Sequence, residues 1–111
     1  MIGDATQAAA LMPKSGHMAN QHGKAAAAAV VELMNGRPAM PQMMANTCYS
    51  YIDDTAAVHV ASVHRWVPEK NTLETVPGAG GLSPATDRKV WELEGEYAWG
   101  WAEAIWGDML G

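Results

Sequence analysis

Five consecutive alanines, Ala25 to Ala29, are the strongest constraint on how this chain can fold. Alanine has the highest intrinsic helix propensity, so the run predicts a helix. Ser15 is placed to cap that helix, and Asn35-Gly36 followed by Pro38 predicts where it ends. The alanines also give the helix a surface without bulk, which lets a second backbone approach closely. We therefore expect the helix to be buried against a sheet; high helix propensity without burial is the alternative.

Strand signals follow this helix. Residues 37–45 contain two prolines, which block regular strand pairing and predict an irregular connector. Residues 47–52 and the valine-rich, alternating residues 57–67 then predict two strands. The gap between them is a short turn at Asp53-Asp54, so we expect an antiparallel hairpin. A third strand is expected at residues 73–76.

Ser83-Pro84 predicts the start of a closing helix that continues to about Met109, because proline suits the first helical position. An apolar stripe runs along it at helical spacing, at Val90, Leu93, Tyr97, Trp101 and Ile105. Further apolar residues widen the stripe: Trp91, Ala98, Ala102 and Trp106. Gly95 and Gly100 each cost about 1 kcal/mol relative to alanine inside a helix, so we expect both to allow close approach of another group.

These elements predict an α+β fold with an N-terminal helix, a small antiparallel sheet of two or three strands and a long C-terminal helix. A length of 111 residues with 49% apolar residues fits one domain with a modest core. So much tryptophan on one helix predicts either a partner domain or self-association.

The charge pattern excludes several classes of function. The net charge is -5 and no basic stripe is present, so a nucleic-acid partner is not expected. The acidic side chains gather near the C-terminus, at Asp87, Glu92, Glu94, Glu96, Glu103 and Asp108. They indicate a solvated helix face or, alternatively, a docking surface for a basic protein. The sequence contains no apolar stretch of about 18 residues, the length that would predict a membrane span.

The four histidines do not have the spacing of metal ligands. His17 and His22 are separated by five positions, as are His59 and His64, so neither pair is expected to bind a metal. Any of the four could still relay a proton near neutral pH.

Four segments together resemble a known family: residues 2–4 (Ile-Gly-Asp), 13–16 (Pro-Lys-Ser-Gly), 23–31 and 46–50 (Asn-Thr-Cys-Tyr-Ser). They are similar to the C-terminal portion of the flavoprotein subunit of flavocytochrome c sulfide dehydrogenase. That subunit is a flavoprotein with two dinucleotide-binding domains. The resemblance implies that residues 1–36 are the tail of an FAD-binding domain and residues 37–111 a C-terminal flavin-binding interface domain. It also implies that N-terminal FAD- and NAD-type domains belong to the complete protein.

The resemblance assigns cofactor contacts to several residues. Gly3 and Asp4 would hold the ribityl chain of FAD. Lys14, Ser15 and Gly16 mark a helix start whose free N–H groups and partial positive charge would face the flavin ring. Trp101 matches a tryptophan of the closing helix and would lie near the flavin, with core packing as the alternative.

Cys48 is the predicted catalytic residue. With one cysteine in the chain, no internal disulfide is possible. In proteins that resemble this one, the corresponding cysteine forms a redox-active disulfide with a cysteine from the flavin-binding half. Sulfide attacks this disulfide, and the resulting thiolate passes electrons to FAD, in keeping with thiol–disulfide exchange. The alternative from the residue alone is a cysteine that packs as a small apolar side chain.

The resemblance thus predicts part of an FAD-dependent sulfide dehydrogenase of the periplasm that delivers electrons to a c-type cytochrome subunit. The chain alone is expected to be inactive and to lose FAD, because its Gly-rich segment, residues 78–81, lacks the strand and helix of a dinucleotide-binding turn. A sulfide:quinone oxidoreductase-like enzyme is a rival. Its amphipathic C-terminal segments differ from the acidic, tryptophan-rich helix expected here. A self-associating α+β module without enzymatic activity is a rival of another class.

Overall fold

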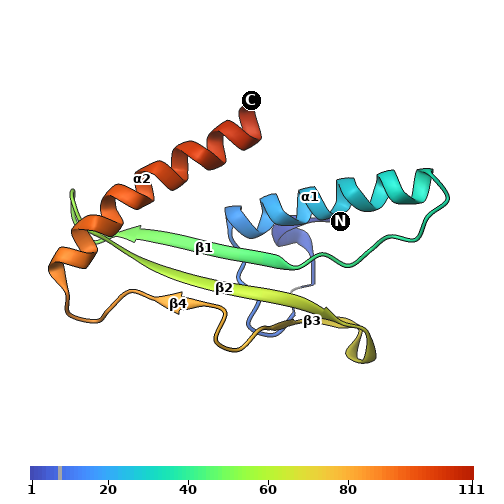
Figure 1. The fold of residues 1–111 in the computed structure, drawn as a ribbon, viewed down its shortest axis with the longest axis horizontal. Coiled ribbons are helices and arrows are strands. Elements are labelled where there is room, and N and C mark those ends of the chain that lie inside the picture. The colour runs from blue at the N-terminus through green and yellow to red at the C-terminus, as the bar shows by residue number, and fades with distance from the viewer. Residues whose placement is uncertain (8) are drawn as a thin grey trace.

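The structure, a computed structural model, describes residues 1–7 and 9–111. Its main elements in chain order are helix α1 (Gly16–Met34), strands β1 (Met44–Tyr51), β2 (Ala57–Val67), β3 (Thr72–Thr75) and β4 (Gly81–Leu82), and helix α2 (Arg88–Leu110). Two short 3-10 helices, η1 (Gly3–Ala5) and η2 (Pro68–Lys70), precede α1 and β3. The predicted α+β class, with a helix, a small antiparallel sheet and a long closing helix, is confirmed (Figure 1).

Helix α1 has the expected ends but only part of the expected burial. The Ser15 side chain caps it by accepting a hydrogen bond from the Met18 N–H at 3.1 Å, and Asn35 follows its last residue. Met18 and His22 in its first half are buried, whereas Leu33 and Met34 near its end are 62% and 83% exposed. The expectation of a buried helix is therefore wrong for its second half, which extends past the sheet (Figure 1).

The sheet is built on β2, its longest strand. β1 pairs with β2 in an antiparallel hairpin that runs from Met44 opposite His64 to Tyr51 opposite Ala57, as predicted. On the other side of β2 lie β3 and then the two-residue β4, both antiparallel to it. β4 begins at Gly81, the last residue of the Gly-rich segment 78–81. A Cβ on Gly80 would lie 2.3 Å from the Ala61 carbonyl oxygen, so this approach to β2 requires glycine.

The hairpin turn is fastened to α2 by a carboxylate. Asp53 Oδ1 accepts hydrogen bonds from the backbone N–H groups of Thr55 and Ala56, both at 2.9 Å. Its other oxygen pairs with the Arg88 guanidinium at the start of α2. Arg88, together with the two backbone donors, holds the pKa of Asp53 well below its ordinary value.

Helix α2 differs from the prediction in its start and in its buried face. Asp87 caps it through the Val90 N–H at 3.2 Å, so it begins four residues after Pro84. Its buried residues are Glu94, Gly95 and Ala98, while Leu93 and Tyr97 of the predicted stripe are 45% and 55% exposed. The small residues decide which face packs, because they let the helix approach the backbone of the hairpin turn.

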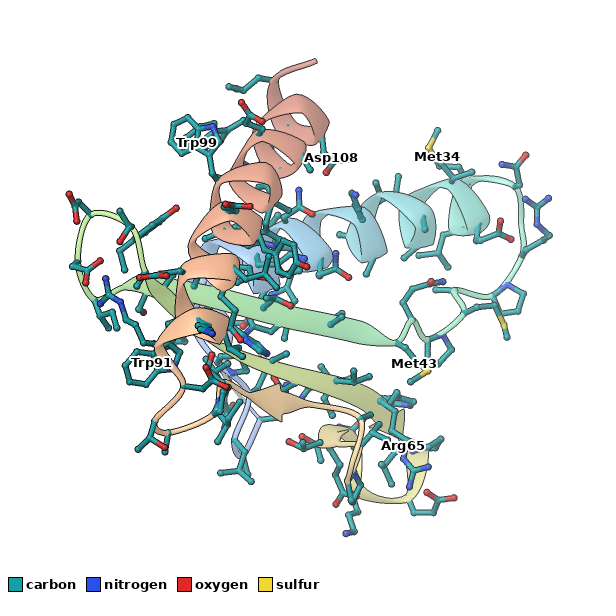
Figure 2. The ribbon with its side chains drawn as sticks, turned by 60° about the vertical axis from the view of Figure 1, so that its left-hand side comes forward. Met34, Met43, Arg65, Trp91, Trp99 and Asp108 are labelled. Carbon is teal, nitrogen blue, oxygen red and sulfur yellow. The ribbon has the colours of Figure 1, made fainter. Side chains whose placement is uncertain are left out.

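Few apolar side chains are fully enclosed in the part of the chain that the structure describes: Met18, Ala56, Ala57 and Ala98. The radius of gyration is 16.1 Å, above the value of about 13 Å expected for a compact domain of this length. The molecule is accordingly thin, with a shortest extent of 21 Å. Large apolar side chains such as Trp99 therefore lie on its surface, on the side of α2 that faces away from α1 (Figure 2).

Candidate functional site

A groove of about 350 Å³ lies where the start of α1, the middle of β1 and the second half of α2 meet. Four of the residues predicted as functional line it: Ser15, Gly16, Cys48 and Trp101. The two helices are also joined beside it, because Asp108 of α2 accepts a hydrogen bond from Asn20 at 3.0 Å and pairs with Lys24 at 2.9 Å. Three segments that are distant in the sequence thus form one groove.

The start of α1 supplies hydrogen-bond donors to this groove. The N–H of Met18 is bonded to the Ser15 hydroxyl and that of Ala19 to the Ser15 carbonyl. The first two N–H groups, those of Gly16 and His17, have no acceptor within the described residues. Gly16 is exposed, and a Cβ there would meet no atom within 4 Å, so this helix start is open. It carries the partial positive charge that favours a bound anion or carbonyl oxygen.

Cys48 lies on β1 and is half-buried. Its sulfur is 3.5 Å from both polar atoms of the Asn46 side chain, two positions earlier on the same face of the strand. Asn46 is 2% exposed, and its Oδ1 accepts a hydrogen bond from the Ser15 hydroxyl at 2.5 Å. The amide therefore connects the cap of α1 to the sulfur.

One wall of the groove is aromatic. The ring centroids of His17 and Trp101 are 5.6 Å apart in an edge-on arrangement, and those of Tyr49 and Trp101 are 5.7 Å apart. His17 Nδ1 accepts a hydrogen bond from the Thr47 N–H at 2.9 Å, which fixes the ring against the free edge of β1. Burial, with the nearby charge of Glu94, raises the pKa of Tyr49, so its hydroxyl stays neutral. The rest of the wall is mostly apolar: Ala102, Ile105, Trp106 and Met109.

The other predicted cofactor contacts form a separate cluster beside α1. Gly3 begins η1 with a positive φ of 66° and donates its N–H to His22 Nδ1 at 3.0 Å. Lys14 donates to the Asp4 carbonyl oxygen at 2.9 Å, and the Asp4 side chain is exposed. The structure therefore does not bring Gly3, Asp4 and Lys14 into the groove that holds Cys48.

Sequence reasoning missed the role of His17 in the lining of the groove, that of the buried Asn46 beside Cys48, and one polar cluster. Asn46 and His17 make the contacts described above, and asparagine is uncommon in strands, which is a signal for Asn46. The cluster joins buried Glu94 to His59 Nδ1 at 3.1 Å and to the Ser83 hydroxyl.

This cluster is not a hydrolase triad. Ser83 Oγ and the Glu94 carboxylate both lie at His59 Nδ1, whereas the hydroxyl and carboxylate of a triad occupy opposite ring nitrogens. It fixes the segment before α2 to β2, since Ser83 also accepts the His59 N–H at 2.6 Å.

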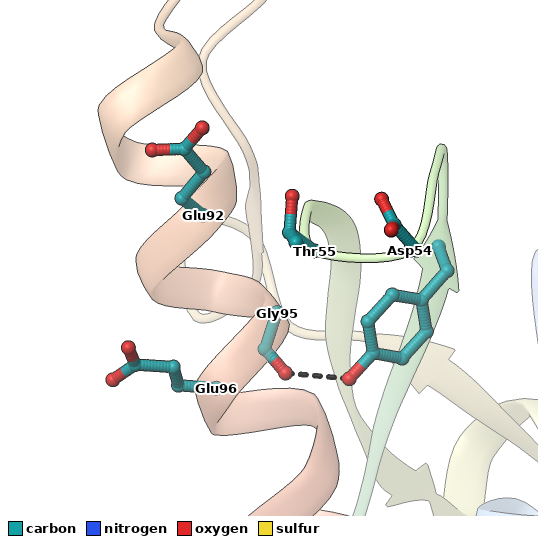
Figure 3. A pocket seen from close by; sticks show the side chains of 6 residues that line it. Asp54, Thr55, Glu92, Gly95 and Glu96 are labelled. Atoms are coloured by element: carbon teal, nitrogen blue, oxygen red, sulfur yellow. Dashed lines mark hydrogen bonds between the residues drawn. The ribbon is translucent and has the colours of Figure 1, made fainter.

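A second cavity, of about 480 Å³, lies between the hairpin turn and α2 (Figure 3). Its rim carries the carboxylates of Asp54, Glu92 and Glu96, and the Tyr51 hydroxyl donates a hydrogen bond to the Gly95 carbonyl oxygen at 2.6 Å inside it. This cavity lies beside the point where α2 contacts the hairpin most closely.

No group of three or more metal-ligating side chains is found in residues 1–7 and 9–111. Over the same residues, no helix has the length and apolar character needed to cross a membrane.

The sequence model of the family "Flavocytochrome c sulphide dehydrogenase, flavin-binding" matches residues 40–110. The chain belongs to this family. The match covers well over half of the chain, from the end of the connector through α2, and it includes Cys48 and Trp101. The resemblance drawn from the sequence is thereby confirmed, and residues 40–110 match the flavin-binding domain of this family.

The size and lining of the groove are compatible with a flavin ring. Its volume falls within the range of small-molecule sites, about 300 to 1,000 Å³. The ring system of a flavin is flat and apolar on its faces, which suits the wall that Trp101 and Tyr49 provide. Its pyrimidine edge carries carbonyl oxygens and gains negative charge on reduction, which suits the open N–H groups of Gly16 and His17.

Proposed function

We propose that this chain supplies the flavin-facing, sulfur-bearing part of an FAD-dependent sulfide dehydrogenase. The groove carries the proposal, since it places a half-buried cysteine beside an open helix N-terminus and an aromatic wall. The family match supports it, because flavin binding is the property for which the family is described.

The predicted residues divide the binding and the chemistry between them. The helix start that Ser15 caps would turn the N–H groups of Gly16 and His17 toward the pyrimidine edge of the flavin, and Trp101 would face its ring. Gly3 and Asp4 would hold the ribityl chain, with Lys14 anchoring their loop through the bond to the Asp4 carbonyl. Bound FAD supplies a two-electron acceptor. Domains outside this chain would hold its pyrophosphate and adenine, since the described residues contain no dinucleotide-binding turn.

Cys48 would contribute one sulfur of a redox disulfide whose second sulfur comes from those other domains. Hydrosulfide attacks one sulfur of the disulfide, and the S–S bond breaks. One cysteine becomes a persulfide, and the other leaves as a thiolate that holds the released electron pair. The groove keeps this sulfur half-buried, which limits its contact with water, and Asn46 fixes its position.

The electrons would pass on to a c-type cytochrome subunit, which fits the name of the family. The periplasm is the location that the resemblance implies. The exposed carboxylates of α2, among them Glu92, Glu96 and Glu103, would suit a basic docking partner.

Sulfide-dependent reduction of FAD in the complete protein tests this proposal. Cys48→Ser should keep FAD bound but abolish anaerobic bleaching by sulfide, because an oxygen cannot form the disulfide that sulfide attacks. Ser50→Ala is the matched control, since Ser50 lies two positions further along β1, is exposed and stands outside the groove. If the FAD of Cys48→Ser bleached at the rate of the wild type, Cys48 would be only a packed strand residue and the proposed chemistry would be wrong.

A further inference from the structure

The side-chain amide of Asn46 is oriented by its contacts. The Ser15 oxygen already accepts the Met18 N–H, so its own hydrogen is free to be donated. The distance from Ser15 Oγ to the Asn46 amide is 2.5 Å, which matches an O–H···O bond and is too short for an N–H···O bond. The amide oxygen therefore faces Ser15, and the Asn46 N–H₂ group remains available to the sulfur.

This orientation serves Cys48 in both of its protonation states. As a thiol, Cys48 can donate its S–H to Asn46 Oδ1, and as an anion it can accept a hydrogen bond from Asn46 Nδ2, each at 3.5 Å. A buried amide exchanges few of its bonds with water, so this contact persists. The same amide receives the bond from the cap of α1, so the sulfur and the helix start keep a fixed relation.

We propose that Asn46 is a positioning residue that holds the Cys48 sulfur against the start of α1 and donates a hydrogen bond to its anionic form. This inference rests on the proposed role of Cys48 and adds a residue to it. A sulfur that becomes an anion during the reaction is stabilised best by a hydrogen-bond donor that is already in place, because water molecules would first have to reorient around it. Asn46 meets that need without a change of conformation.

The rate of alkylation of Cys48 by iodoacetamide, measured on the chain itself at about pH 8, tests the inference, because only the anionic sulfur reacts. Asn46→Asp keeps the size and the acceptor but removes the N–H donor and adds a negative charge beside the sulfur. Loss of a hydrogen bond to a charged group, with the added negative charge acting in the same direction, is expected to slow the reaction about tenfold or more. Asn46→Leu removes the donor without adding a charge and separates the two effects, because it should also react more slowly than the wild type if the hydrogen bond matters. The matched control is Asn71→Asp, an exposed position in the turn before β3, which should stay within about twofold of the wild type.

If Asn46 had only a structural role, its replacement would raise the alkylation rate, because a loosened groove exposes the sulfur. A folded Asn46→Asp variant that reacts as fast as the wild type, or faster, overturns the inference. If circular dichroism shows that Asn46→Asp does not fold, Ser15→Gly decides, since glycine is tolerated at an N-cap. Slower alkylation in Ser15→Gly supports the inference, and an unchanged or faster rate refutes it. The assay needs neither FAD nor sulfide, so its outcome is independent of the bleaching experiment on Cys48→Ser.

Discussion

Replacing Gly95 with alanine tests the contact that positions α2 over the sheet. A Cβ at this position would lie 2.1 Å from the Thr55 carbonyl oxygen and 3.0 Å from the Thr55 carbonyl carbon. Non-bonded carbon atoms normally stay about 3.5 to 4.0 Å apart, so the helix or the turn must shift by about 1 Å. The clashing atoms are backbone, and the Gly95 carbonyl also accepts the Tyr51 hydroxyl, so the strain cannot be relieved by a rotamer change (Figure 3).

The magnitude follows from two opposing terms. Alanine in place of glycine inside a helix stabilises the folded state by about 1 kcal/mol. Overpacking typically costs about 1 to 3 kcal/mol, and a contact with rigid backbone belongs at the upper end. We expect Gly95→Ala to lower the free energy of unfolding by about 2 kcal/mol, which corresponds to a fall of roughly 8 °C in melting temperature.

Gly100→Ala is the matched control on the same helix, because a Cβ there meets no atom within 4 Å. It should stabilise the chain by about 1 kcal/mol and raise the melting temperature by roughly 4 °C. Circular dichroism melts of both variants at equal protein concentration would measure the difference. Equal melting temperatures, or a more stable Gly95→Ala, would refute the reasoning that Gly95 sets the approach of α2.

Three further predictions concern assembly, cofactor and pH. The isolated chain should self-associate through the exposed surface that includes Trp99 and Trp106, 58% and 48% exposed, and a monomer in sedimentation that binds no hydrophobic dye would contradict this. The purified chain should carry less than one FAD per chain, because the described residues contain no dinucleotide-binding turn to hold the pyrophosphate; a stoichiometric flavin spectrum would disprove that. Burial lowers the pKa of His64 below its ordinary value of 6.5, so the unfolded chain binds more protons and stability should fall as the pH drops below about 6.5. His64→Gln should flatten that pH dependence in urea titrations, and an unchanged slope would assign it to other groups.

Local signals in the sequence predicted most of the elements. The caps of α1 are short-range features, and Ser15 and Asn35 stand at its two ends as expected. The hairpin followed from the valine-rich alternation and the short gap, although β1 begins at Met44, three residues before the expected Thr47.

Two local signals in the sequence could mark the start of α2. Pro84 suits a first helical turn, but Asp87 provides the side-chain cap that the helix uses. The Pro84 carbonyl instead accepts the Trp91 indole N–H at 2.8 Å.

The buried face of α2 could not be read from hydrophobicity. Gly95 and Ala98 pack because they are small, while Leu93 and Tyr97 remain at the surface. Spacing along a helix identifies an apolar face, but the shape of the neighbouring hairpin decides which face it accepts.

The site was predicted through its motifs rather than through physical patterns. The segments around Ser15 and Cys48 carry a family resemblance, and they meet in one groove with Trp101. The amide of Asn46 and the ring of His17 were not predicted, because their roles arise from contacts between residues about 30 positions apart.

A peptide map of the complete protein in its oxidised state, digested without reductant, tests the central claim most directly. The account predicts that the peptide with Cys48 is linked by a disulfide to a cysteine peptide from the FAD-binding domains. Treatment with one equivalent of sulfide should break this link and add one sulfur atom to one of the two cysteines. Recovery of Cys48 as a free thiol from oxidised protein that retains its FAD would contradict the account.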